Sequence, residues 1–288
     1  MSEGEQKLAD QRGKFAQVVK DGRKVPDVEW IGGRILLSTK RIVLVSNEGK
    51  RTIPLSKIRS IKGRQNANQP LAQVSSYISL QMGGDVTLLS PKDHEEFEQT
   101  LYRAILDQQV ILAKHPAVEG GVVQDTGWEK GRLKIDDGEV NLAIATGQFV
   151  EIEIDDVGTV EQNEATIKGD ERPLIEVEHT DKEGTAVETH ISGTPQHVMV
   201  LASLLRKGEQ KNTTDAELSD RESEVLMALY SGVSPFQIPE FVGMDVDTVE
   251  DIFDDLVEQG ILEEQRTRRE VQLKARGRHI ASEAMDEA

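Results

Sequence analysis

Short runs of β-branched and other apolar residues alternate with polar positions in the first third of the chain. Residues 35–37 and 42–45 form two such runs, and a third run begins at residue 52. Between the second and third runs, residues 47–49 (Asn-Glu-Gly) have the composition of a tight turn. Alternation with a period of two places successive side chains on opposite faces of a sheet. The pattern therefore predicts consecutive antiparallel strands.

A second hairpin and a helix are predicted next. Residues 74–82 and 85–90 are separated by the glycine pair at 83–84, which favours a turn. From residue 92 to residue 114 the apolar period becomes helical, and the predicted helix carries its apolar stripe at Phe97, Leu101, Ile105 and Leu112. The first third is thus predicted to be a set of antiparallel strands closed by one amphipathic helix.

The second third repeats this layout at an offset of 98 to 99 residues. Residues 32–37 align with residues 130–135, and residues 53–61 align with residues 152–160. Two further strands are predicted in residues 173–192, followed by another helix that opens with a proline. Two copies of one β-plus-helix domain are the simplest interpretation.

The last third changes to helical periodicity after a polar linker, residues 210–217. A first helix is predicted after the N-cap Ser219, and a short second helix ends at Gly243. The first helix would turn three apolar side chains inward: Val225, Leu226 and Leu229. The third helix, residues 247–259, would bury a longer stripe: Val249, Ile252, Phe253, Leu256 and Val257.

Two strands are predicted after the third helix. Gly260 would cap that helix, residues 261–262 would begin a strand, and residues 271–277 would form the returning strand. Three helices followed by two strands is the order of a winged helix-turn-helix domain. The end of the chain, residues 273–283, also resembles the last part of many archaeal and bacterial winged helices.

Several kinds of catalytic and metal site are excluded by what the sequence lacks. It contains no cysteine, so disulfides, thiolate metal sites and cysteine nucleophiles are absent. Its six histidines lack the spacing that places two zinc ligands on one face of a helix. The glycine pairs at 32–33, 83–84 and 120–121 are expected in turns, and none opens a helix as a phosphate-binding loop does. No catalytic, cofactor-binding or metal-binding residue is predicted, and an enzyme is not expected.

The overall charge and the start of the chain bear on the compartment. The formal net charge of −18 is typical of proteins from the cytosol of extreme halophiles, because molar salt shortens the Debye length to about 3 Å. The first residues lack the basic-then-apolar pattern of a secretory signal, and no apolar run is long enough for a membrane span. A cytoplasmic protein is therefore expected.

Charge is distributed unevenly along the chain. Residues 1–114 carry 18 basic and 13 acidic groups, residues 115–209 carry 8 and 20, and residues 210–288 carry 8 and 19. A basic first third in so acidic a protein suggests an acidic partner. The candidate partner-binding cations are Arg34, Lys40, Arg41, Lys50, Arg51, Lys57 and Arg59. Only some of them can share one face, because neighbouring residues of a strand alternate between faces.

The first third also carries a recognisable pattern of single residues. It comprises Trp30, Gly33, Ile35, Leu37, Thr39, Arg41, Ile42, Gly49, Ile53, Pro54, Leu55, Ile58 and Ile61. This pattern resembles pleckstrin-homology-like (PH-like) and GRAM domains, and the second third keeps its hydrophobic positions. Such domains are mostly binding scaffolds, so an anionic lipid headgroup, a nucleic acid and an acidic protein surface are all possible ligands. High salt weakens a purely electrostatic contact, which favours a protein partner.

The outer face of the third helix in the last third is acidic. It is predicted to expose Asp247, Glu250, Asp251, Asp254, Asp255 and Glu258, without one Lys or Arg. A reading helix in a DNA groove needs cations at phosphates and donors at base edges, so this face argues against DNA. The basic residues of this part lie on the predicted wing: Arg266, Arg268, Arg269, Lys274, Arg276 and Arg278. Contact of the wing alone with DNA remains open, and protein contact is preferred.

The predicted fold class is therefore α+β with several domains. Two tandem PH-like, GRAM-like β-rich domains, each closed by a helix, are followed by a winged helix-turn-helix domain. The expected boundaries are residues 1–114 for the basic first domain, 115–209 for the acidic second domain, 210–217 for a linker and 218–288 for the winged helix.

This domain order, together with the segment of residues 13–63, resembles the archaeal taxis protein family CheF. The resemblance implies a non-enzymatic adaptor without catalytic residues or cofactors. Such an adaptor would connect the phosphorylated response regulator CheY to the switch proteins at the cytoplasmic face of the archaellum motor. It would also contact the CheC and CheD proteins, meet the membrane only through the motor, and bind no nucleic acid.

Two other functions remain open from the residues alone. A haloarchaeal transcription regulator would use the PH-like domains as sensors and the wing for DNA. A membrane-surface module would bind lipid through its GRAM-like domain. The sequence also leaves open which domain binds which partner, whether binding depends on CheY phosphorylation, and the oligomeric state.

Overall fold

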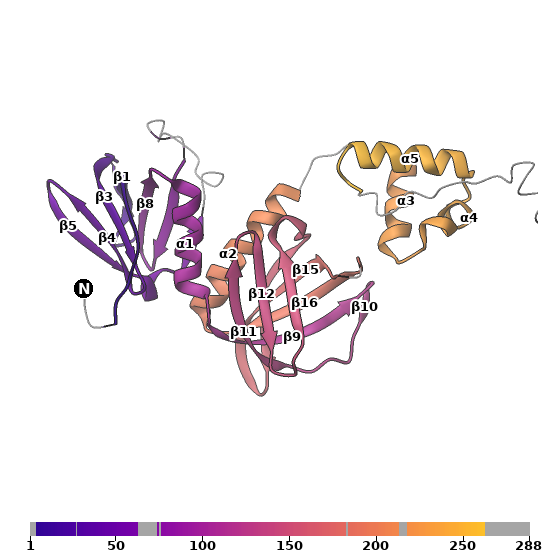
Figure 1. Ribbon diagram of the computed structural model, residues 1–288, viewed down its shortest axis with the longest axis horizontal. Coiled ribbons are helices and arrows are strands. Elements are labelled where there is room, and N and C mark those ends of the chain that lie inside the picture. The colour runs from indigo at the N-terminus through magenta and orange to yellow at the C-terminus, as the bar shows by residue number, and fades with distance from the viewer. Residues whose placement is uncertain are drawn as a thin grey trace, which may run out of the picture. The chain divides into compact units, whose positions relative to one another are not determined.

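The computed structural model describes residues 4–26, 28–62, 74, 76–182, 184–212 and 218–262 (Figure 1). The protein is α+β, with two antiparallel β-sheets that are each followed by a helix and then a small helical C-terminal region. Contacts divide the chain into two units, residues 1–216 and residues 217–288. None of the described helices combines the length and the apolar character needed to cross a membrane.

The first sheet is arranged around the long strand β1 (Lys7–Lys20). Its strand order is β5-β4-β3-β1-β8-β7-β6, with β2 paired to β1. A short 3-10 helix, η1 (Leu55–Lys57), joins β5 to β6, and helix α1 (His94–Leu106) follows β8. The other strands are β2 (Arg23–Lys24), β3 (Ile31–Ser38), β4 (Arg41–Ser46), β5 (Gly49–Pro54), β6 (Ser60–Lys62), β7 (Ile78–Met82) and β8 (Asp85–Pro91).

The second sheet has the same topology, which confirms the predicted repeat. Its order is β13-β12-β11-β9-β16-β15-β14, with β10 paired to β9. The 3-10 helix η3 (Ile154–Asp156) corresponds to η1, and helix α2 (Pro195–Asn212) corresponds to α1. The strands are β9 (Val110–Glu119), β10 (Val122–Val123), β11 (Glu129–Asp136), β12 (Glu139–Ile144), β13 (Phe149–Glu153), β14 (Val160–Ile167), β15 (Asp170–Thr180) and β16 (Ala186–Ser192).

The alternation seen in the sequence sets which side chains are buried. In the first sheet Ile35, Leu37, Ile42, Leu44 and Ile53 are at most 2% exposed, and the corresponding residues of the second sheet are also buried. Each such side chain contributes about 1.5 to 3 kcal/mol when it is buried. One cluster of buried residues extends through both repeats, and α1 and α2 are in contact. The two repeats therefore share a core.

The end of helix α1 and the central strands β1 and β9 differ from the sequence prediction. The helix predicted through Leu112 ends at Leu106, where Asp107 is extended and Gln108 has a φ of 62°. Leu112 lies instead in β9, the central strand of the second sheet. The matching strand of the first sheet, β1, was not predicted at all. The boundary expected at residue 114 thus falls inside β9, while the division into domains stays a prediction.

A third difference concerns the glycine pair at 32–33, which lies within strand β3 and not in a turn. A Cβ atom at Gly33 would lie 2.1 Å from the carbonyl oxygen of Val45. The glycine is therefore required by the close approach of β4, as is common for a glycine within a strand. The other two pairs occupy turns, as predicted.

The C-terminal unit contains α3 (Asp220–Tyr230), η4 (Pro235–Gln237), α4 (Ile238–Val242) and α5 (Val246–Glu258). Its three main helices match the prediction, and Gly243 and Gly260 both have the positive φ expected of helix-ending residues. The N-cap Ser219 forms a capping box with Glu222. Val257 was expected to be buried but is 38% exposed. Residues 261–262 were expected to begin a strand but form a bend, and the predicted turn and returning strand after them lie outside the described residues.

Candidate partner-binding surfaces

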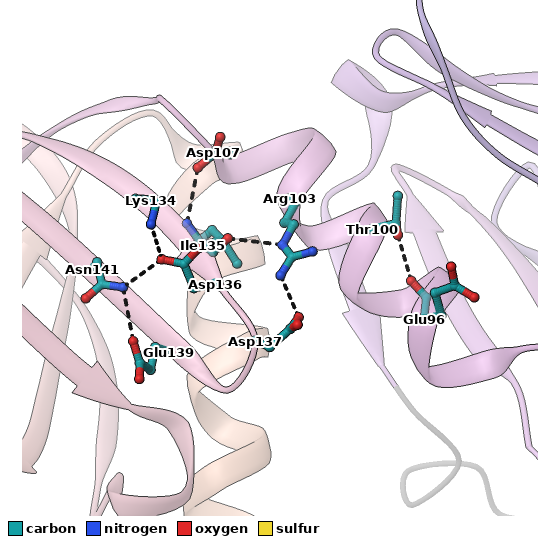
Figure 2. Close-up of polar contacts among 10 residues, drawn as sticks. All are labelled: Glu96, Thr100, Arg103, Asp107, Lys134, Ile135, Asp136, Asp137, Glu139 and Asn141. Carbon is teal, nitrogen blue, oxygen red and sulfur yellow. Dashed lines mark hydrogen bonds and ion pairs between the residues drawn. The ribbon is translucent and has the colours of Figure 1, made fainter.

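The two repeats are connected by hydrogen bonds that run in both directions. At the end of α1, the Arg103 guanidinium donates to the Ile135 carbonyl at 3.1 Å and to the Asp137 carboxylate at 2.5 Å (Figure 2). The carboxylate of Asp107 accepts from the Ile135 amide at 3.2 Å. The end of α1 therefore binds the β11–β12 hairpin of the other repeat through the backbone amide and carbonyl of Ile135.

The reverse contact comes from α2. The side-chain amide of Gln196 donates to the carbonyl oxygens of Leu55 and Ile58, at 2.7 and 3.0 Å. Both oxygens belong to the 3-10 segment that joins β5 to β6 of the first repeat. Each helix thus holds the backbone of the other repeat, so surfaces on the two sheets are held together within one unit.

Replacing Arg103 tests this connection. In Arg103→Ala the Ile135 carbonyl loses its side-chain donor, and we expect the free energy of unfolding of residues 1–216 to fall by about 1 to 2 kcal/mol. Thermal and urea unfolding of the full chain in molar KCl measure the change. Lys134→Ala is the matched control, because the Lys134–Asp136 ion pair is local and exposed and should change stability by less than about 0.5 kcal/mol. Equal losses in the two variants would contradict the role of Arg103.

Two of the predicted cations already have carboxylate partners within the first repeat. The Arg34 guanidinium contacts both Asp10 oxygens, at 2.7 and 2.8 Å, and Arg41 contacts both Glu5 oxygens, at 2.6 and 2.8 Å. Hydrogen bonding to Arg34 lowers the pKa of the Asp10 carboxyl, and hydrogen bonding to Glu5 raises the pKa of Arg41. These arginines therefore hold β1 and the segment before it against the sheet.

Lys50 and Arg51 show how the strand divides neighbouring cations between two faces. Arg51 is half-buried on the inner face, where it donates to the Gln17 side chain at 2.9 Å, and burial lowers the pKa of its guanidinium. Lys50 points to the outer face beside Val45, which is 36% exposed. The predicted basic set is therefore not one continuous surface.

A cationic row nevertheless crosses the outer face of the first sheet. Strand register places Lys50 opposite Val45, Val45 opposite Arg34, and Arg34 opposite Arg12. Arg12 was missed by the sequence analysis because β1 was not predicted. Lys50 and Arg12 are exposed and form no ion pair within the described part of the chain. We call these four residues the cationic row.

The remaining predicted cations of the first repeat lie elsewhere. Lys57 and Arg59 flank Ile58, whose carbonyl accepts from Gln196, and both are exposed. Lys40 lies in the turn between β3 and β4 and is also exposed. The seven predicted cations thus lie in different places. Arg34 and Arg41 are ion-paired, and Arg34 also belongs to the outer row with Lys50. Arg51 faces inward, Lys40 lies in a turn, and Lys57 and Arg59 flank the segment that contacts α2.

Helix α5 carries the second charged surface. All six predicted carboxylates are exposed: Asp247, Glu250, Asp251, Asp254, Asp255 and Glu258. The opposite side of the helix packs Val249, Ile252 and Leu256 into the core of the C-terminal unit. Its N-cap is Asp245, whose pKa is lowered by hydrogen bonds from Thr248. The predicted wing cations Arg266, Arg268, Arg269, Lys274, Arg276 and Arg278 lie outside the described residues.

The second sheet brings together polar residues that sequence spacing did not connect. The Thr189 hydroxyl lies between the rings of His115 and His179, at 2.7 and 2.8 Å from their nitrogens. Thr189 is fully buried, so no substrate reaches this hydroxyl. Glu188 and His190, two residues apart on β16, lie beside Glu176 of β15. The histidines lack helical ligand spacing, and the signal in the sequence is the alternation Glu-x-His of a strand, which places both side chains on one face.

The described residues thus define an α+β protein built from a tandem β-rich repeat and a small helical unit, with a charged surface on each unit. A family described as archaeal chemotaxis signal transduction system protein F matches residues 7–211. A second family, described as a domain of unknown function, matches residues 217–286. The chain belongs to the archaeal CheF family, and it is a taxis protein of archaeal chemotaxis signal transduction.

Two relatives come from Halobacterium salinarum. The chain is 51% identical over 289 residues to the taxis protein CheF1, and the alignment covers 100% of both proteins. It is 24% identical over 258 residues to the taxis protein CheF2, covering 83% of this chain and 87% of that protein. Membership of this family implies a signalling role and not catalysis.

Proposed function

We propose that this taxis protein is a non-enzymatic adaptor between the response regulator CheY and the switch proteins of the archaellum motor. In this proposal it also contacts CheC and CheD, and it acts at the cytoplasmic face of the motor to control the direction of rotation. Neither catalysis nor a nucleic acid is part of this function.

The observation that carries the proposal is that the two units carry surfaces of opposite charge, one basic and one acidic. An adaptor needs at least two binding faces, and the cationic row lies on residues 1–216 while the acidic face of α5 lies on residues 217–288. Electrostatic complementarity sets partner choice and association rate more than affinity. A row of cations around the exposed Val45 suits an acidic surface with an apolar contact, and the carboxylates of α5 suit a basic one.

The finer fold assignment is part of the same proposal. Two sheets of identical strand order, each followed by a helix, support tandem PH-like domains. The three helices α3, α4 and α5 support the helical part of a winged helix-turn-helix domain, and its predicted returning strand falls outside the described residues. We infer that both have been adapted to protein contact, because α5 exposes six carboxylates and contains no Lys or Arg.

Capture experiments in molar KCl test the function. The immobilised full chain is expected to retain phosphorylated CheY more strongly than unphosphorylated CheY, and to retain the motor switch proteins. In one variant, Arg12→Glu and Lys50→Glu reverse the cationic row. In another, Asp251→Lys and Asp254→Lys reverse the centre of the α5 face. We expect each variant to lose one partner by about tenfold or more while it keeps the other.

Matched charge changes elsewhere are the controls. Lys130→Glu with Lys168→Glu changes the net charge as the row variant does, and Glu224→Lys with Glu240→Lys changes it as the α5 variant does. All four residues are exposed. Both controls are expected to retain both partners. Failure of the unmodified chain to capture either partner would overturn the adaptor function, and equal losses in variants and controls would overturn the assignment of the surfaces.

A further inference from the structure

The outer face of the second sheet carries a group of three possible metal ligands. Glu176 of β15 is the cross-strand partner of His190 on β16, and Glu188 lies two residues before His190 on the same face. The available ligand atoms of the three side chains all lie within 4.8 Å of one another. Nε2 of His190 lies 3.7 Å from one Glu176 oxygen and contacts a Glu188 oxygen directly.

The distance of 3.7 Å between the His190 nitrogen and the Glu176 oxygen is close to what one shared metal ion requires, whereas the Glu188 oxygen contacts that nitrogen and has to draw back to share the ion. Ligand atoms bound at about 2.1 Å in tetrahedral geometry lie about 3.4 Å apart. One imidazole nitrogen with two carboxylates is a donor set that suits zinc and related divalent ions. The side chains are 17%, 25% and 34% exposed for His190, Glu176 and Glu188, so an ion can enter from solvent.

Neighbouring residues contact two of the three side chains, Glu176 and His190. Asn163 of β14 donates to the second oxygen of Glu176 at 2.7 Å, which leaves the first oxygen facing His190. The centroid of the Trp128 ring lies 6.2 Å from that of the His190 ring, and the two rings are tilted by 41°. Hydrogen bonds from outside the ligand set are what orients carboxylate and imidazole ligands in metal sites.

The first repeat provides an internal comparison for this group. A buried row of the first repeat corresponds by strand order to one of the second: Phe15, Leu89 and Ile78 match Ala113, Ile191 and Ile175. The neighbouring row of the first repeat is Ala16, Leu88 and Ser79, and its counterpart in the second repeat is Lys114, His190 and Glu176. Ala16 and Leu88 are only 1% and 3% exposed, so the first repeat has an apolar patch here. At the same positions of the second repeat lie His190 and Glu176. Trp128, which directly precedes β11, lies beside His190.

We propose that Glu176, Glu188 and His190 form a binding site for one divalent transition-metal ion of the zinc type on the outer face of the second sheet. The three protein ligands leave at least one coordination position for water. Asn163 is a positioning residue for Glu176. The site shares no residue with the cationic row or with the acidic face of α5, so it adds to the adaptor function and does not depend on it.

Metal titration of the untagged full chain in molar KCl tests the site. Zn²⁺ is added in competition with a chromogenic chelator, and Co²⁺ is followed by its visible absorption. We expect one ion per chain, and a loss of affinity of more than about tenfold in His190→Gln and in Glu176→Gln. Asn163→Ala should weaken binding by about tenfold, because Glu176 loses its orienting bond. Circular dichroism at the start of each titration checks that the variants are folded.

The control is His197→Gln, which removes a histidine of α2 outside the group and should leave the affinity unchanged. Lys114→Gln is a second test, in which the expected change has the opposite sign. Lys114 is the cross-strand neighbour of His190 on β9, and loss of its positive charge should tighten Zn²⁺ binding. Absence of Zn²⁺ and Co²⁺ binding at millimolar concentration would overturn the proposal. Binding that is equally strong in His190→Gln and Glu176→Gln would overturn it as well.

Discussion

Gly208→Ala is expected to destabilise the protein by about 3 kcal/mol or more, although the glycine lies inside helix α2. A Cβ atom at this position would lie 1.6 Å from the carbonyl oxygen of Ile154 and 2.8 Å from its carbonyl carbon. Both atoms belong to backbone, at the start of η3, so the clash cannot be relieved by a rotamer change. The helix and the 3-10 segment would have to move apart in the shared core.

The sign of this effect distinguishes packing from helix propensity. Alanine in place of glycine normally stabilises a helix interior by about 1 kcal/mol, so propensity alone predicts a rise in stability. We expect the melting temperature to fall by about 6 to 12 °C, from the usual shift of 2 to 4 °C per kcal/mol in a unit of this size. Differential scanning calorimetry of the full chain in molar KCl measures it.

Gly32→Ala is the control for this substitution. Gly32 lies in β3, and a Cβ atom there would have no heavy atom within 4 Å. Its melting temperature should equal or slightly exceed that of the unmodified protein, because alanine reduces the entropy of the unfolded chain. A Gly208→Ala protein at least as stable as this control would contradict the close approach of α2 and η3.

The hairpins and helices that the sequence predicted correctly depend on local patterns. The β3-β4-β5 and β15-β16 strands alternate over short distances and are joined by turns, so a period of two identifies them. The repeat was found for the same reason, since Ile53, Ile58 and Ile61 have buried counterparts at a fixed offset. The inner stripe and the acidic face of α5 likewise follow from one helical period.

The central strand of each sheet could not be found in this way. Strand β1 is long and largely polar, and its partners β3 and β8 are distant in sequence. Leu112 matches a helical period with Leu101 and Ile105, but the backbone turns at Gln108 and pairing with β16 makes its segment a strand. Non-local pairing therefore overrode the local pattern.

The candidate sites depend on the same non-local register. Arg12, Arg34 and Lys50 form one row only because β1, β3, β4 and β5 pair in a particular register, and a shift by one residue would turn them to other faces. Glu176 and His190 are 14 positions apart along the chain and become neighbours through the β15-β16 pairing. No period in the sequence carries this information.

The stacked pair of His115 and His179 makes stability depend on pH in the mildly acidic range. His179 donates from Nδ1 to the Thr180 carbonyl at 3.1 Å, so its Nε2 accepts from the Thr189 hydroxyl. The Thr189 oxygen in turn accepts from Nδ1 of His115. This order of donors requires a neutral His179, because a proton on its Nε2 would face the hydroxyl proton. His115 can donate from Nδ1 in either charge state, and its burial favours the neutral form.

Burial, and next the neighbouring His179, lower the pKa of His115 from 6.5 to about 4, and burial lowers the pKa of His179. Below pH 6.5 the unfolded chain therefore binds protons that the folded chain does not. The contribution of the neutral pair to the free energy of unfolding is fully present above pH 6.5 and is lost as the pH falls toward 4. Because His115 is partly exposed, we expect a loss of about 1 to 2 kcal/mol from this residue.

The variant His115→Gln separates this contribution from the titration of the many carboxylates. Glutamine occupies the corresponding place in the first repeat, Gln17, and its amide can still donate to the Thr189 hydroxyl. At pH 7 the two proteins should differ little in urea unfolding. Between pH 6.5 and pH 4 the unmodified protein should lose about 1 to 2 kcal/mol more than the variant, since only its histidine takes up a proton on unfolding. Parallel stability curves for the two proteins would show that His115 titrates alike in the folded and unfolded chain, against the buried neutral pair.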